Sequence, residues 1–90
     1  MANKKKNFWY VLVLTEQGPV FVTDIQYQPY ERASWDTSAK PLGLSESKAK
    51  DLATTLMMNF ETAYPIWSPG EITGQPYLYD KGKFEWVWNK

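Results

Sequence analysis

The chain has 90 residues, and its ten basic and ten acidic side chains cancel to a formal net charge of zero. It contains no Cys and no His, which excludes disulfides, thiolate nucleophiles, Cys/His zinc sites and histidine general bases. A chain of this length predicts one domain over residues 1–90.

The positive charge is concentrated at the start, where Lys4, Lys5 and Lys6 precede the first apolar segment. Residues 1–7 are therefore expected to form a flexible basic N-terminus. Without these three lysines, seven basic side chains remain against ten acidic ones, which argues against nucleic acid as a partner. No apolar run approaches the roughly 18 residues of a membrane span, so we expect no membrane insertion. The absence of Cys fits a cytoplasmic location.

Residues 8–15 (FWYVLVLT) predict the first strand, because they are rich in β-branched and aromatic residues and contain no breaker. Both faces of this strand are apolar, which indicates a central position in a sheet that is covered on both sides. A turn at residues 16–19 (EQGP) and a continuous second strand at residues 20–28 (VFVTDIQYQ) complete a predicted hairpin.

Residues 29–41 are small and polar and predict a long loop, within which residues 32–35 could add a short strand. The loop brings Tyr30, Arg32 and Trp35 close together in sequence. Interface centres favour these residue types, and long loops are often functional, so the three are candidate partner-binding residues. The alternative is that Tyr30 and Trp35 only close the edge of the sheet.

Residues 44–60 predict the only helix, with Ser45 as its N-cap and Leu44 and Ala49 as a hydrophobic staple. Asn59 is expected to take the left-handed conformation that ends the helix. The face toward the sheet is predicted from the i, i+3, i+4 spacing of Ala49, Leu52, Ala53, Leu56, Met57 and Phe60.

Residues 61–68 (ETAYPIWS) predict a strand, and Pro65 places it at a sheet edge or a bulge because proline has no N–H to donate. Residues 77–89 predict a second hairpin around a Lys81–Gly82 turn. A three-residue turn is the alternative and would shift the pairing of the two strands. With a two-residue turn, five aromatic side chains of this hairpin share one face: Tyr77, Tyr79, Phe84, Trp86 and Trp88.

The order β-β-α-β followed by a C-terminal β-hairpin predicts an α+β fold, an antiparallel sheet with one helix packed on one face. One helix leaves the second face of the sheet in need of cover. We expect the C-terminal hairpin to cover Trp9, Val11 and Val13, either within its own chain or across a homodimer. The alternative is that its rings form a site for a foreign partner.

Three stretches, WYVLVLTEQGPVFVTDI, LGLSESKAKDLATTL and NFETAYPIW, carry a resemblance to a known group. Together they resemble small uncharacterised proteins of phages and prophages of Gram-positive bacteria, which run from a hairpin through a Ser-initiated helix to a strand. The resemblance covers roughly residues 8–67 and implies an accessory protein of a mobile element, with no catalytic residues to carry over.

Catalytic chemistry finds no support in the spacing of the available side chains, and Asp36, Asp51 and Glu71 are not spaced as a metal site. We expect a non-enzymatic protein-binding module without cofactor or metal, a phage or prophage accessory protein acting on a host or phage protein. The alternatives are a single-stranded nucleic-acid-binding protein using the aromatic hairpin, or a protein whose only interaction is self-assembly. The candidate partner-binding residues are Tyr30, Arg32, Trp35, Tyr77, Tyr79, Phe84, Trp86 and Trp88.

Overall fold

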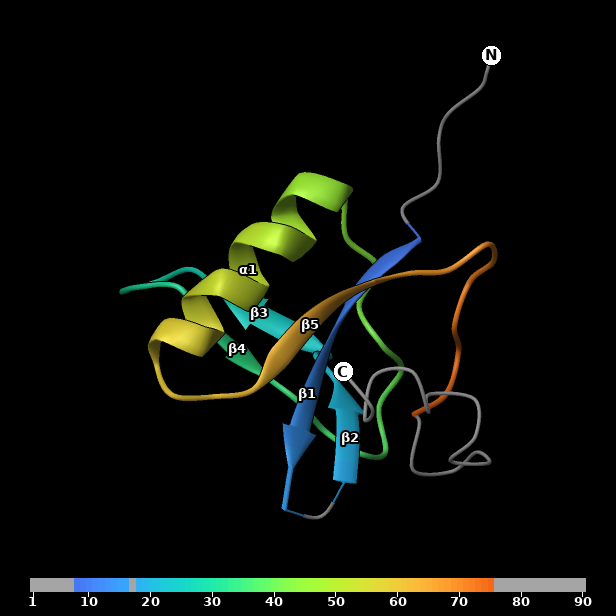
Figure 1. The fold of residues 1–90 in the computed structure, drawn as a ribbon, viewed down its shortest axis with the longest axis horizontal. Helices are drawn as coiled ribbons and strands as arrows, with labels where there is room; N and C mark the ends of the chain where they lie inside the picture. Colours follow the sequence, from blue (N-terminus) through green and yellow to red (C-terminus); the bar gives the residue numbers. More distant parts are fainter. Residues whose placement is uncertain (1–7, 17, 76–90) are drawn as a thin grey trace.

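Five strands and one helix make up the part of the chain that the computed structural model describes, residues 8–16 and 18–75 (Figure 1). They are β1 (Trp9–Thr15), β2 (Gly18–Phe21), β3 (Asp24–Gln26), β4 (Arg32–Ser34), α1 (Glu46–Met58) and β5 (Ala63–Trp67). β1 is the centre of a three-stranded antiparallel sheet in the order β2-β1-β5, and β3 and β4 form a separate two-stranded hairpin. The predicted α+β fold is confirmed.

The helix covers the face of the sheet to which Val11 and Val13 belong. These two valines are fully buried in one cluster with Ala49, Ala53 and Ala63. Small alanine side chains on α1 and β5 let the helix backbone approach the β-branched valines closely, which fills the space between helix and sheet. The expectation that a C-terminal hairpin covers Trp9, Val11 and Val13 is therefore wrong, because α1 packs there.

The opposite face of the sheet carries larger side chains. Tyr10 and Phe21 are almost fully buried there, with ring centroids 5.6 Å apart, in a cluster with Leu12 and Ile66. The Tyr10 hydroxyl accepts a hydrogen bond of 2.9 Å from the backbone N–H of Ile72. The segment that follows β5 thus packs on this face. The predicted hairpin at residues 77–89, with Tyr77, Tyr79, Phe84, Trp86 and Trp88, lies outside the described residues, as do residues 1–7.

The predicted second strand is not continuous, because the chain changes its pairing partner after Val22. The Val22 N–H donates to Val11 in β1, but the Thr23 N–H donates to Ser34 in β4. The side chains of Val22 and Ile25 both reach the helix-side cluster, a three-residue spacing that an unbroken strand cannot place on one face. The break therefore buries one more apolar side chain against α1.

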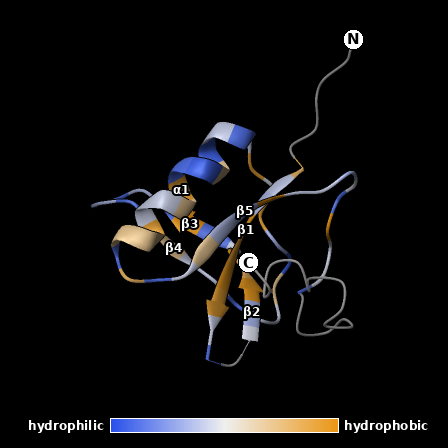
Figure 2. Ribbon diagram, viewed as in Figure 1, coloured by the Kyte–Doolittle hydropathy of each residue, from blue (hydrophilic) through white to orange (hydrophobic). Residues whose placement is uncertain are grey.

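The helix begins as predicted and ends differently. The Ser45 Oγ accepts a hydrogen bond from the Lys48 N–H, and Leu52 and Leu56 are buried toward the sheet. Asn59 has a φ of −100°, and Phe60 takes the left-handed conformation instead, with a φ of 69°. The predicted stripe is also too long, since Met57 is 50% exposed and Phe60 is 96% exposed. The last turn of α1 is more apolar than its first turns (Figure 2).

Prolines occupy both outer edges of the three-stranded sheet. The hydrogen bond from the Leu14 N–H to the Thr62 carbonyl fixes which backbone groups of β5 face β1. The backbone nitrogen of Pro65 is among those that point away from β1. The same reasoning from the Val22–Val11 bond places Pro19 and Phe21 on the outer edge of β2. Each proline removes one donor from its edge, which disfavours pairing with another strand.

Candidate functional site

Two exposed aromatic side chains, those of Tyr27 and Tyr30, lie on the β3–β4 hairpin. We call residues 26–32 the hairpin tip, which consists of the last residue of β3, the connecting loop and the first residue of β4. The tip projects away from the three-stranded sheet (Figure 1). Tyr27 and Tyr30 are 58% and 61% exposed. The Arg32 guanidinium lies 5.4 Å from the centroid of the Tyr30 ring, and its Nη2 donates a 2.8 Å hydrogen bond to Gln26 Oε1.

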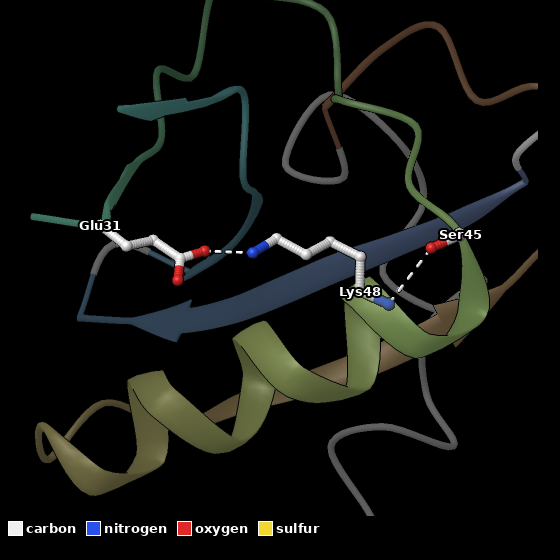
Figure 3. Close-up of polar contacts among 3 residues, drawn as sticks. All are labelled: Glu31, Ser45 and Lys48. Atoms are coloured by element: carbon white, nitrogen blue, oxygen red, sulfur yellow. Dashed lines mark hydrogen bonds and ion pairs between the residues drawn. The ribbon is translucent and has the colours of Figure 1, made fainter. Parts of the chain in front are cut away.

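The hairpin tip is attached to the first turn of the helix. Lys48 Nζ forms a hydrogen-bonded ion pair with the Glu31 carboxylate, while the Lys48 backbone N–H donates to the N-cap Ser45 (Figure 3). The same Nζ lies 5.2 Å from the centroid of the Tyr27 ring. The hydrogen bond to Glu31 raises the pKa of Lys48 above its usual value. Through this residue the helix N-terminus holds both ends of the tip loop.

Trp35 does not join the exposed pair. It is partly buried and packs, together with Ala33, against the helix-side cluster. Alternation along β4 explains the separation, since residues two apart share a face and Arg32 belongs to the other one. The structure thus brings Tyr30 and Arg32 together and places Trp35 at the base of the hairpin. The other candidates, Tyr77, Tyr79, Phe84, Trp86 and Trp88, lie outside the described residues.

Sequence reasoning missed the contribution of Tyr27, because it treated this residue as part of a continuous strand. The turn chemistry of Gln28 and Pro29 was the available signal, since proline so close to a strand end favours a turn. Nothing in the sequence pairs Tyr27 with Lys48, which is 21 positions further along the chain. That contact depends on how the helix packs.

The basic side chains of residues 8–16 and 18–75 are engaged with neighbours. Lys40 pairs with Glu71 at 3.2 Å and Lys50 with Glu46 at 2.7 Å, in addition to the contacts of Arg32 and Lys48. Within the described part of the chain there are four basic and eight acidic side chains, so the surface is predominantly negative. No three acidic side chains of that part lie close enough to hold a metal ion.

The helix of the described region, α1, lacks the length and the apolar character needed to cross a bilayer. Comparison of the chain with protein-family models, with curated proteins and with solved structures finds no match. The candidate site therefore rests on its own geometry.

Proposed function

We propose that the chain is a small non-enzymatic protein-binding module, a phage or prophage accessory protein that acts on a host or phage protein. The observation that carries the proposal is the hairpin tip, where two exposed tyrosines, one of them in cation–π contact with an arginine, project from the sheet. Tyrosine and arginine are enriched among the residues that contribute most to binding at protein interfaces.

Preorganisation of the tip supports the same function. An exposed loop normally loses conformational entropy when it binds, which lowers its affinity. Here the Lys48–Glu31 ion pair and the cation–π contact of Lys48 with Tyr27 hold the loop against α1 before any partner arrives. The tyrosines are thus presented in a defined geometry, at a lower entropic cost of association.

The alternatives fit the described residues less well. Twice as many acidic as basic side chains oppose the phosphate contacts that dominate nucleic-acid affinity. Outward-facing prolines on β2 and β5 oppose self-assembly through strand pairing. Binding of a protein partner through the side chains of the hairpin tip conflicts with neither the negative charge nor the prolines at the sheet edges.

Affinity capture from a lysate of Gram-positive bacteria, with and without nuclease, tests the proposal. We expect the wild-type chain to retain a specific protein after nuclease treatment, and a Tyr27→Ala/Tyr30→Ala variant to lose it. A Met58→Ala variant is the matched control, because Met58 is 73% exposed and lies outside the tip. Capture that disappears with nuclease, or that the tip substitutions leave unchanged, would contradict the proposal.

A further inference from the structure

A second surface feature lies at the opposite end of the β3–β4 hairpin from the tip. An open pocket of about 1000 Å³ is formed where β1 turns into β2, beside the end of β4 and the chain that follows α1. None of the tip residues borders it. The pocket is lined by Leu14, Thr15, Glu16, Val20, Ser34, Trp35, Asp36, Thr37, Phe60 and Glu61.

Two aromatic residues are among those that line the pocket, and they lie in different environments. Trp35 is partly buried and packs against the helix-side cluster, which fixes the position of its ring. Phe60 is 96% exposed and has a φ of 69°, a conformation that few residues other than glycine adopt. Phenylalanine is disfavoured at this position for two reasons: its backbone rarely adopts a positive φ, and its large apolar ring is exposed to water.

Three of the ten residues that line the pocket are acidic. Glu16, Asp36 and Glu61 are exposed, and none of them forms an ion pair within residues 8–16 and 18–75. The Ser38 N–H donates to the Asp36 carboxylate at 2.9 Å and lowers the pKa of that carboxyl, which keeps it ionised. The three carboxylates do not meet as a metal site. Their distribution around the pocket suits an extended cationic group.

We propose that this pocket binds an arginine-bearing segment of a protein partner. A guanidinium can stack on an aromatic ring and pair with carboxylates at the same time. The lining of this pocket includes both kinds of residue, the aromatic Trp35 and Phe60 and the acidic Glu16 and Glu61. A second copy of this chain is a poor occupant, because its only arginine, Arg32, is held by Gln26 and Tyr30. The inference goes beyond the proposed function, since it adds a site that the hairpin tip does not share.

The test uses the full-length ¹⁵N-labelled protein and a short peptide of alternating glycine and arginine. We expect saturable shifts of the backbone amides at residues 14–16, 34–37 and 60–61. Matched peptides with lysine or glutamine in place of arginine separate the contribution of guanidinium stacking from that of positive charge, because lysine keeps the charge without the planar group and glutamine is uncharged. The lysine peptide should bind more weakly than the arginine peptide, and the glutamine peptide should produce no shifts.

Charge-removing variants decide whether the pocket is responsible. Glu16→Gln/Glu61→Gln should weaken the arginine peptide by about tenfold, and Phe60→Ser should also weaken it. Asp24→Asn/Asp51→Asn is the matched control, because it removes two exposed carboxylates outside the pocket and should change affinity by less than about twofold. Both charge variants alter surface side chains only, so they should keep the wild-type spectrum.

Three results would overturn the inference. If both charge variants weakened binding of the arginine peptide equally, the binding would reflect a general attraction of a cationic peptide to an acidic protein. Shifts centred on residues 26–32 would place binding at the hairpin tip. The absence of saturable shifts at about 1 mM peptide, the weak limit of specific recognition, would show that no site exists.

Discussion

The side-chain amide of Gln75 hydrogen-bonds to both outward-facing backbone groups of Phe21 in β2. Its Oε1 accepts from the Phe21 N–H at 2.8 Å, and its Nε2 donates to the Phe21 carbonyl at 3.4 Å. The same Nε2 also donates to the carbonyls of Ala39, at 2.8 Å, and Asp36, at 3.3 Å. Gln75 is only 1% exposed, so one side chain pairs with the edge of β2 as a neighbouring strand would and connects it to the loop after β4.

Gln75→Leu should destabilise the protein by about 1–3 kcal/mol, because it removes the polar partners of buried backbone groups while keeping a similar volume. Chemical denaturation followed by tryptophan fluorescence measures the change. Gln28→Leu, at an exposed position, is the control and should change the free energy of unfolding by less than about 0.5 kcal/mol. Equal effects of the two substitutions would mean that the Gln75 contacts contribute nothing.

Two adjacent helical residues test which face of α1 packs on the sheet. Leu56 is 7% exposed and its neighbour Met57 is 50% exposed. Leu56→Ala should cost about 2–5 kcal/mol, because it leaves a cavity against β1 and β5. Met57→Ala should be close to neutral, since the lost contacts are few and alanine favours the helix. Urea denaturation measures both, and a neutral Leu56→Ala would contradict the packing described above.

Pro65 offers a test of how the sheet edge avoids self-association. Pro65→Thr restores an outward-facing N–H in a β-branched residue that favours strands, so the variant should associate in a concentration-dependent manner. Sedimentation velocity over a range of concentrations detects it. Pro69→Thr changes an exposed proline outside the strand and should leave the association state unchanged. A Pro65→Thr variant that behaves as wild type would show that proline does not protect this edge.

The Lys48–Glu31 contact predicts a dependence of stability on alkaline pH. The folded-state pKa of Lys48 is raised above its ordinary value of 10.5. Its stabilising contribution is therefore fully present below pH 10.5 and is lost as the pH rises through the folded-state pKa. The contribution should be below about 1 kcal/mol, because the pair is partly exposed to solvent.

The measurement compares wild type with Lys48→Met by urea denaturation on both sides of pH 10.5. The difference between the two proteins should shrink as the pH rises. The difference between the two proteins, and not the absolute stability of either one, is the informative quantity. A difference that is independent of pH would contradict the role of the ion pair.

Phe60→Gly should stabilise the fold by about 1 kcal/mol, because glycine adopts the left-handed conformation after a helix without steric cost. Asn59→Gly is the control and should destabilise, since Asn59 has a negative φ and gains nothing from glycine. Thermal denaturation distinguishes the two. A Phe60→Gly variant less stable than wild type would mean that the exposed ring makes contacts that favour folding.

Local patterns in the sequence were sufficient for the elements whose determinants lie close together in the chain. The apolar run of residues 8–15 predicted a central strand, and Ser45 with Leu52 and Leu56 predicted the start and the buried face of α1. Pro65 predicted an edge strand or a bulge, and β5 lies at the edge of the sheet. In each case a short-range property decides the outcome, namely side-chain alternation, capping chemistry or a missing donor.

The tertiary structure alone decided which partner each apolar surface meets. Both faces of β1 are apolar, so alternation could not show that α1 packs on Val11 and Val13; the small side chains Ala49 and Ala53 decide it by close approach. Likewise, the chain leaves the three-stranded sheet at Thr23, whose N–H donates to the Ser34 carbonyl in β4. Gln75 reaches Phe21 across 54 positions. Such contacts depend on the shape and polar groups of surfaces that are distant in sequence, which no local pattern encodes.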